Sequence, residues 1–203
     1  MSDGGVQDAV AAIRAGHSVI LPTDTVYGLC ATPYESEPTE HLYRLKGRDP
    51  LQPSALLAAD LDVLFDCVPE LRGRAGMIAR ALLPGPYTLV LANPARRFRW
   101  LTGVNQEAIG VRVAELCVPA RSVLEQVGVV VATSANAPGR PDPARLEDVP
   151  AELREKAAAF VDCGELPGMP STVIDFTGPE PRVVREGAAS SAEAIARVNS
   201  ALA

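Results

Sequence analysis

The stretch "LPTDTVYGLC", Leu21–Cys30, decides how the rest of the chain is interpreted. It follows the apolar "SVI" of Ser18–Ile20, and before that a helical spacing of apolar residues ends at Gly16. This order predicts a helix, then a buried strand, then a polar loop that opens where the strand ends. The loop holds two threonines, an aspartate and a tyrosine, but no residue placed like a catalytic nucleophile. The question is which chemistry needs hydroxyl groups and no nucleophile.

The remainder of the chain alternates between strand and helix patterns. Strands are predicted at 54–59, 87–93, 108–114, 129–133, 160–163, 172–176 and 182–185, and helices at 39–47, 70–83, 120–128 and from about 191. We found no repeat and no convincing domain boundary. The pattern therefore predicts one α/β domain over residues 1–203, built on a mixed sheet.

Composition excludes several classes of protein. The chain has 203 residues, of which 47% are hydrophobic and 22% charged, enough for a full core. Its net charge of -6 gives no general attraction to nucleic acid, so a polyanion would need a local basic cluster. No apolar run is long enough for a membrane span and no basic leader precedes an apolar one, so we expect a cytoplasmic protein without membrane contact.

Cysteine and histidine usage argues against a metal site. The four cysteines are Cys30, Cys67, Cys117 and Cys163, and none forms a close pair along the sequence. Since the chain has only two histidines, a metal cage is not expected. We predict four ordinary reduced cysteines.

Polar residues collect where predicted strands end, which is where open α/β sheets place their ligands. Thr23–Thr25 follow the first strand, and Ser134 and Asn136 follow the strand 129–133. The "KGR" of Lys46–Arg48 ends a predicted helix and offers a point charge and a planar fork, a pair suited to polyphosphate. A simpler alternative stays open, because basic residues at a helix end also favour the helix dipole. The phosphate-binding motifs GxxxxGK[ST] and GxGxxG are absent.

Two arginines lie in or beside apolar strands. Arg112 stands between Val111 and Val113, so its guanidinium needs an anionic partner, either structural or a ligand. Arg185 ends the last predicted strand, where a surface ion pair would explain it equally well.

Seven short motifs follow one another along most of the chain: "PTDTVYGL", "KGR", "PGPYTLVL", "GVRV", "ATSAN", "PSTVID" and "VVREG". In this order they closely resemble the YrdC/Sua5 family, in particular its single-domain threonylcarbamoyl-AMP synthases. The resemblance implies an open twisted mixed sheet with flanking helices and a concave cleft. It also implies a nucleotidyltransferase that joins L-threonine, bicarbonate and ATP into threonylcarbamoyl-adenylate and pyrophosphate, the first step of N6-threonylcarbamoyladenosine modification of tRNA.

The same resemblance assigns roles to residues by motif. It implies that Lys46 and Arg48 are catalytic. The implied substrate-binding residues are Thr25, Arg112, Ser134 and Ser171, and the implied ATP-binding residues are Arg48, Gln52, Asn136 and Arg185. Mg²⁺ would come with ATP and would need no protein side chain. Downstream tRNA threonylcarbamoyl transferase proteins are implied partners, and weak RNA binding is a further expectation.

Three positions depart from the family pattern. Leu57 stands near the usual place of a histidine, Ala144 replaces a threonine, and Ala114 replaces the proline that follows the arginine strand. These departures bear on the amino-acid substrate and on ATP affinity. Two alternatives stay open: a related carbamoyl-adenylate-forming enzyme acting on carbamoyl phosphate, and a non-catalytic protein that binds RNA or nucleotide in the same cleft.

Overall fold

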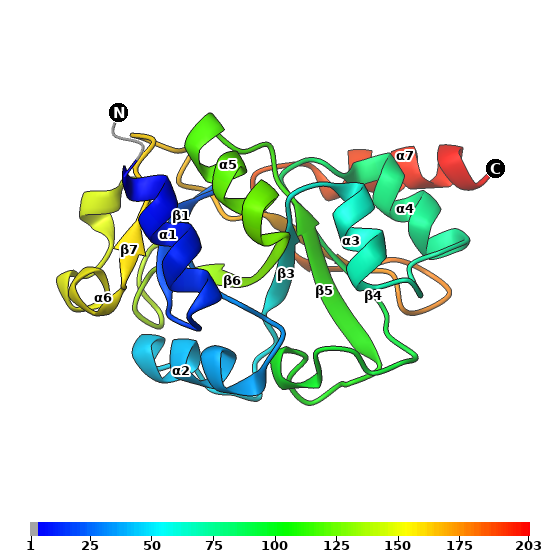
Figure 1. Cartoon of the computed structure of the whole chain (residues 1–203). Helices are drawn as coiled ribbons and strands as arrows, with labels where there is room; N and C mark the ends of the chain where they lie inside the picture. Colours follow the sequence, from blue (N-terminus) through cyan, green and yellow to red (C-terminus); the bar gives the residue numbers. More distant parts are fainter. Residues whose placement is uncertain (1–3) are drawn as a thin grey trace.

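A single nine-stranded mixed sheet forms the centre of the computed structural model, which describes residues 4–203 (Figure 1). Met1–Asp3, part of the N-terminal stretch used above to argue against a leader, lie outside the described residues. The strands are β1 (Val19–Pro22), β2 (Tyr27–Ala31), β3 (Ala55–Ala58), β4 (Tyr87–Ala92), β5 (Ala108–Val113), β6 (Val129–Ser134), β7 (Ala159–Phe160), β8 (Thr172–Asp175) and β9 (Arg182–Arg185). Their order is β7-β1-β2-β6-β3-β5-β4-β8-β9, which confirms the predicted open mixed sheet.

Helices cover both faces of this sheet. They are α1 (Gly4–Arg14), α2 (Ser36–Lys46), α3 (Leu61–Cys67), α4 (Arg74–Leu82), α5 (Val118–Val127), α6 (Ala151–Lys156) and α7 (Ser191–Leu202). Successive strand residues point to opposite faces, so Leu56 packs in one core and Leu57 in another. The Leu56 core includes residues of α2, α3, α4 and α7, and the Leu57 core includes residues of α1 and α5. The first and last helices lie at opposite ends of the molecule (Figure 1).

The opening stretch is a hairpin rather than a loop. β1 and β2 pair antiparallel, with Val19 opposite Cys30 and Pro22 opposite Tyr27, so only residues 23–26 form the turn. All five residues of β2 are buried. A strand buried on both faces shows no alternation of apolar and polar residues, which is why the sequence pattern did not reveal it.

Two helices begin at residues other than those predicted, and a glycine or a proline lies near the start of each. α4 begins at Arg74 rather than at residue 70, because Gly73 has a φ of 55° and breaks the helix there. α2 begins at Ser36 rather than at residue 39, and Pro38 is accommodated in its first turn. The short helices α3 and α6 were not predicted from the sequence.

The prediction of four reduced cysteines is wrong. Cys117 and Cys163 form a disulfide with a Cα–Cα distance of 6.7 Å, although 46 positions separate them along the chain. Cys117 directly precedes α5 and Cys163 follows β7, and α1 contacts both α5 and β7. Tertiary packing therefore brings together two cysteines whose spacing carries no signal. Cys30 and Cys67 are free thiols.

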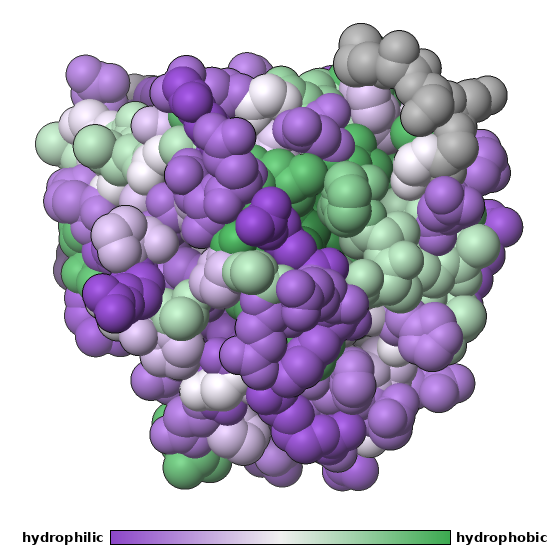
Figure 2. Space-filling view, turned by 90° about the vertical axis from the view of Figure 1, so that its left-hand side faces the viewer, coloured by the Kyte–Doolittle hydropathy of each residue, from purple (hydrophilic) through white to green (hydrophobic). Residues whose placement is uncertain are grey.

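The surface beside β7 is mostly hydrophilic, with an apolar area near its centre (Figure 2). Phe160 of this edge strand is 49% exposed. Among the described residues, no helix is both long enough and apolar enough to cross a membrane.

Cys117→Ser is expected to lower the free energy of unfolding by about 2–4 kcal/mol, because the disulfide closes a long loop and restricts the unfolded chain. Chemical denaturation of both proteins, with and without reductant, measures the difference. Reductant should destabilise the wild type and leave Cys117→Ser unchanged. Cys67→Ser is the matched control, since that thiol is unpaired. Equal stability of oxidised wild type and Cys117→Ser would contradict the prediction.

Candidate active site

The end of α2 and the end of β6 meet in one hydrogen-bonded cluster. Lys46 is the last residue of α2, and its Nζ donates to Asn136 Oδ1 at 2.9 Å and to Thr133 Oγ1 at 3.1 Å. Its Nζ also lies 3.2 Å from Ser134 Oγ, which itself donates to Asn136 Oδ1 at 2.7 Å. β2 pairs antiparallel with β6, with Gly28 opposite Ser134, and so fixes this cluster beside the β1–β2 hairpin. Lys46, Ser134 and Asn136 are thus brought together.

Arg48 joins Lys46, Ser134 and Asn136 from the loop after α2, and these four residues are here called the tetrad. Gly47 takes a left-handed conformation with φ of 66°, which ends the helix and turns the chain. Arg48 Nη2 donates to Pro53 O at 2.6 Å, its Nη1 donates to Thr133 Oγ1 at 3.4 Å, and its buried Nε has no partner within residues 4–203. Gln52, by contrast, is exposed in the following loop and makes no side-chain hydrogen bond to the tetrad.

Arg112 has an internal anionic partner at the tip of the hairpin. Its Nη2 donates to Asp24 Oδ1 at 2.6 Å and to Thr25 Oγ1 at 3.2 Å. Both charged side chains are almost fully buried, at 11% and 9% exposure. The backbone N–H of Glu115 also donates to Asp24 Oδ2, at 3.4 Å. Of the two anionic partners considered for Arg112, a structural one is therefore present. This partner, Asp24, lies in the hydroxyl-rich turn of residues 23–26.

Ser171 and Arg185 form a third part of the site. Arg185 Nε and Nη2 donate to Ser171 O at 3.1 and 2.8 Å, so its partner is a backbone carbonyl rather than the surface carboxylate considered from sequence. The Ser171 hydroxyl lies 2.8 Å from Thr88 Oγ1 on β4. β4 runs parallel to β8, with Thr88 opposite Val173, and this register brings Thr88 to Ser171.

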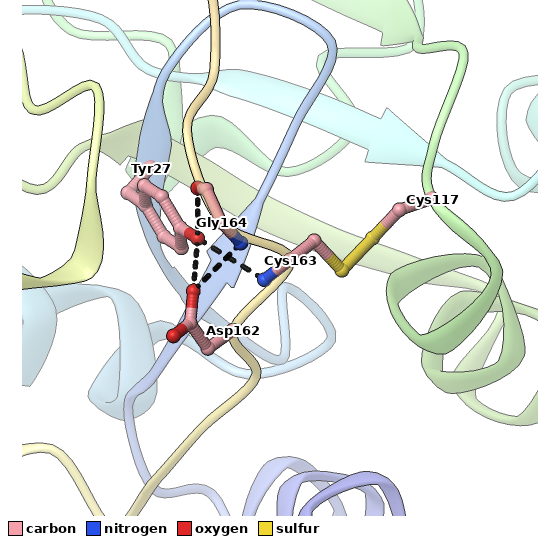
Figure 3. The surroundings of a disulfide bond; sticks show 5 residues. All are labelled: Tyr27, Cys117, Asp162, Cys163 and Gly164. Atoms are coloured by element: carbon pink, nitrogen blue, oxygen red, sulfur yellow. Dashed lines mark hydrogen bonds between the residues drawn. A yellow bond between two sulfur atoms is a disulfide. The ribbon is translucent and has the colours of Figure 1, made fainter. Parts of the chain in front are cut away.

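The segment 161–171, here called the strap, ties the hairpin to the disulfide. The N–H of Gly168 donates to Thr25 O at 2.9 Å. The Tyr27 hydroxyl lies 2.6 Å from Asp162 Oδ1 and accepts from the N–H of Cys163 at 3.1 Å, next to the Cys117–Cys163 bond (Figure 3). Burial, reinforced by Asp162, raises the pKa of Tyr27 to about 12, so the hydroxyl stays neutral. The strap therefore holds the turn where it enters β2, at Thr25 and Tyr27.

Four cations of the site repel one another. Burial, with a smaller contribution from Arg48, lowers the pKa of Lys46 to about 8. Burial likewise lowers the pKa of Arg48 and of Arg112, and Arg185 contributes to both shifts. Like charges lower each other's pKa only within electrostatic reach, so Arg48 lies near both Lys46 and Arg185, and Arg185 lies near Arg112. An anion bound among these cations would relieve the repulsion.

A metal centre made by the protein does not fit this chemistry. Among residues 4–203, no group of three or more histidine, cysteine or acidic side chains could hold a metal ion. The site offers mainly cationic and hydroxyl groups, which bind anions rather than a divalent cation.

Three polar contacts of the site were not assigned from the sequence. Thr133 contacts both Lys46 and Arg48, Thr88 contacts Ser171, and Asp24 binds Arg112. Asp24 was noticed only as a polar residue at a strand end. Thr88 and Thr133 are threonines in otherwise mostly apolar strands, and that position was the signal that could have marked them.

The positions that depart from the family pattern lie around the site. Leu57 is buried in β3 opposite Arg112, and Ala114 is buried directly after β5. Ala144 packs against the strap, since a Cβ placed on Gly168 would lie 3.1 Å from the Ala144 Cβ. None of the three contributes to the hydrogen bonds described above.

Comparison with known proteins agrees with this arrangement. A family model for Sua5, YciO and YrdC proteins, described as "Telomere recombination", matches residues 11–187. The chain belongs to the Sua5/YciO/YrdC family. This confirms the family predicted from the seven motifs.

Within the Sua5/YciO/YrdC family, a protein of Mycobacterium tuberculosis is 34% identical over 195 residues, which cover 96% of this chain and 88% of the relative. The threonylcarbamoyl-AMP synthase of Pyrococcus abyssi is 31% identical over 90% of this chain and 54% of its own length. The structure of P. abyssi Sua5 complexed with L-threonine superposes with a TM-score of 0.86 at 30% identity, covering 98% of this chain and 58% of that one. YciO of E. coli gives 0.82 at 26% identity, with 94% and 92% covered.

A polyphosphate bound near Lys46 should raise the pKa of that amine from about 8, so binding of ATP at pH 8 is expected to take up protons. Uptake should vanish at pH 6, where the amine is already charged. Calorimetry in buffers of different ionisation enthalpy measures it. Lys46→Arg keeps the charge but does not titrate, so it should bind without uptake; equal uptake in this variant would contradict the assignment.

The same shift affects stability with a defined sign. The unfolded chain binds a proton at this lysine up to its ordinary pKa of 10.5, whereas the folded protein loses it near 8. Below pH 8 the charged Lys46 therefore lowers the free energy of unfolding. This loss of stability declines as the pH rises from 8 toward 10.5.

Proposed function

We propose that this chain is an L-threonylcarbamoyladenylate synthase, which uses L-threonine, bicarbonate and ATP and releases pyrophosphate. The observation that supports it best is a series of neighbouring cations, Lys46, Arg48, Arg185 and Arg112, which extends to a hydroxyl-rich turn. The names of the relatives agree with the proposal. As the chain spans only 58% of the P. abyssi Sua5 chain, the comparison with that protein covers the shared domain alone.

The proposed reaction needs no protein nucleophile, which answers the question raised by the opening stretch. The amine of threonine attacks the carbon of bicarbonate, and loss of water gives a carbamate. A carbamate oxygen then attacks the α-phosphorus of ATP, and the bond to the bridging oxygen of pyrophosphate breaks. Holding these groups in line and stabilising the developing phosphate charge account for the required catalysis.

Lys46 and Arg48 are proposed to bind the phosphates. Their neighbours hold them in place, because Asn136 Oδ1 and Thr133 Oγ1 accept from Lys46 while Pro53 O accepts from Arg48. Ser134 and Asn136 would contribute further polar contacts to the nucleotide and the carbamate. Gln52, although exposed and outside the cluster, lies on the loop beside Pro53 and is retained as an ATP-binding residue of the proposal. Mg²⁺ would enter as part of MgATP, held by the phosphates.

Threonine is proposed to bind between the hairpin and the strap. Arg112 carries five N–H donors, and Asp24 and Thr25 accept from Nη2, which leaves donors for a carboxylate. Thr25 and Ser171 are buried hydroxyls, at 0% and 3% exposure, that could accept from or donate to the amino acid. Asp24 would then orient the Arg112 guanidinium, and it would not occupy the N–H donors that bind the carboxylate of threonine.

We also propose a cytoplasmic location for the enzyme, with downstream tRNA threonylcarbamoyl transferase proteins as partners. The Cys117–Cys163 disulfide weighs against a reducing compartment, because disulfides are rare in cytosolic proteins of mesophiles.

The central test is pyrophosphate release from ATP with threonine, with serine, and without an amino acid, each in the presence and absence of bicarbonate. Release is expected only when both threonine and bicarbonate are present. ATP binding without release under any of these conditions would leave a nucleotide-binding protein and would refute the proposed activity.

Lys46→Ala is expected to lower threonine-dependent pyrophosphate release by about 100-fold or more, because a cation that faces developing phosphate charge contributes to the transition state. The melting temperature should change little, since burial and the neighbouring Arg48 already destabilise the charged ammonium in the folded protein. Steady-state kinetics and thermal unfolding measure the two effects. A large loss of stability with unchanged turnover would support a structural role at the helix end instead.

Arg112→Lys keeps the charge but loses the planar fork. It is expected to raise the KM for threonine about 10-fold, with a smaller change for ATP, and to lower thermal stability through the weakened contact with Asp24. Asp24→Asn is the companion variant, because it disturbs the ion pair and leaves the fork intact. If Arg112→Lys lowers stability while the KM for threonine stays unchanged, Arg112 is a structural residue only.

A further inference from the structure

The Cys117–Cys163 disulfide joins two chain segments that both contact the hairpin turn. The first runs from the end of β5 to Cys117, and in it the N–H of Glu115 donates to Asp24 Oδ2 at 3.4 Å. The second is the strap, which contains Cys163 and contacts the same turn through a backbone hydrogen bond to Thr25 O at 2.9 Å. The disulfide therefore closes a covalent clamp around the turn.

Each clamped segment is continuous with a residue proposed to bind threonine. Arg112 lies five residues before Cys117, and Ser171 lies eight residues after Cys163. The carbonyl of Ser171 also accepts from Arg185 Nη2, at 2.8 Å. The disulfide is thus outside the proposed active site but is connected to it along the chain from both sides. Movement of either segment would displace a group that is proposed to contact the amino acid.

The strap depends on few other contacts for its position. Residues 161–171 all lie in the described part of the chain, and none of them belongs to a helix or a strand. Its noncovalent anchors include the Tyr27 hydroxyl, which accepts from the N–H of Cys163 (Figure 3), and Ala144 O, which accepts from the N–H of Leu166 at 2.8 Å. Met169 is 54% exposed. A surface segment held mainly by backbone hydrogen bonds opens at low free energy, so the disulfide is an important restraint on the strap.

The sulfur atoms of the disulfide are within reach of a reductant. Both cysteines are partly exposed, and their neighbours Val118 and Gly164 are exposed, Val118 to 80%. Exposed disulfides are reduced more readily than buried ones. Disulfides that form in reducing compartments are usually transient and redox-sensing. The proposed cytoplasmic location and the disulfide therefore agree if the bond is reversible.

We propose that the Cys117–Cys163 disulfide is a reversible redox switch that sets the affinity of the proposed active site for threonine. In the oxidised protein the clamp holds Arg112 and Ser171 in position around the turn. In the reduced protein the strap is free to move, and threonine must order it again on binding, which lowers the affinity. The switch rests on the proposed function, because threonine is the ligand whose binding it controls.

Reduction of the disulfide requires a dithiol. One thiolate of the dithiol attacks a sulfur of the protein, the S–S bond breaks, and a mixed disulfide and one protein thiolate form. The second thiolate of the dithiol then attacks the mixed disulfide and releases the other cysteine. The dithiol loses two electrons and becomes a disulfide, while Cys117 and Cys163 gain two electrons and two protons and become thiols. Oxidised glutathione reverses the change and is itself reduced to two glutathione thiols.

The phosphate-binding side of the proposed active site should respond less to reduction. Within residues 4–203, the side chains of Lys46 and Arg48 donate to groups of β6, of the loop after it and of Pro53, and none of these groups belongs to the strap. Reduction is expected to raise the Kd for threonine about 10-fold, an ordinary size for coupling between two sites. The Kd for ATP should change little.

Calorimetric titration of threonine into oxidised and dithiothreitol-reduced protein tests the switch. Alkylation with iodoacetamide followed by mass spectrometry counts the free thiols of each sample. Hydrogen exchange should become faster in residues 161–171 after reduction and stay unchanged in β6. Oxidised glutathione should restore both the threonine affinity and the slow exchange.

Two variants assign the effect to this disulfide. Cys117→Ser cannot form it, so the variant should bind threonine like the reduced wild type whether or not dithiothreitol is present. Cys67→Ser is the matched control, because it removes a free thiol and keeps the disulfide, and it should respond to dithiothreitol as the wild type does. Circular dichroism verifies that the reduced wild type and Cys117→Ser stay folded, as expected for a sheet with a hydrophobic core on each face.

The switch is supported if threonine affinity falls on reduction, returns on oxidation and is insensitive to dithiothreitol in Cys117→Ser. Equal affinity in both redox states would overturn the switch and leave the proposed function standing. Absence of threonine binding in both states would refute the proposed function and the switch with it. A disulfide that resists dithiothreitol in the folded protein, or whose reduction unfolds the whole domain, is a permanent structural bond, and either result would also overturn the switch.

Discussion

The ion pair between Arg112 and Asp24 is the contact on which the site depends. Arg112 comes from the middle of β5, and Asp24 lies at the tip of the β1–β2 hairpin, so a 2.6 Å contact joins the centre of the sheet to the turn. Removal of one partner of such a buried pair costs about 3–5 kcal/mol, because it leaves the other charge without compensation. The strap binds the same turn at Thr25 O, so its position also depends on the pair.

The other cations of the site have no such compensation. Lys46 donates only to neutral oxygens, Arg48 donates to a backbone carbonyl and a threonine hydroxyl, and Arg185 donates to Ser171. Hydrogen bonds to neutral acceptors satisfy the donors but do not cancel the charge, so burial and the neighbouring Arg48 lower the pKa of Lys46 to about 8. The folded protein thus keeps a space of positive potential that an anionic ligand would fill. The repulsion among these cations lowers the stability of the folded protein, and a bound anion would restore it.

The predictable parts of the fold are those whose signal is local. Helix α7 and strands β4 and β6 follow from periodicity and flanking residues, and the motifs identified the family. Strand β2 does not, because burial of Leu29 and Cys30 on opposite faces hides its period of two. The Cys117–Cys163 disulfide depends on α5 and β7 packing near α1, which no spacing of cysteines encodes. The site shows the same division, since "KGR" is visible as a motif whereas the contact of Thr88 with Ser171 depends on strand register.

Net charge and local charge act on different scales in this protein. A total of -6 sets the long-range field, which is screened beyond about 8–10 Å at physiological salt. Within that distance, a ligand responds to the nearest side chains. Arg112 is paired with a buried aspartate, whereas the ion pair of Arg97 with Glu70 is partly exposed to water, so the interactions of Arg112 act in a lower dielectric. The buried cations of the proposed active site can therefore act strongly on a bound anion, although the protein as a whole is negatively charged.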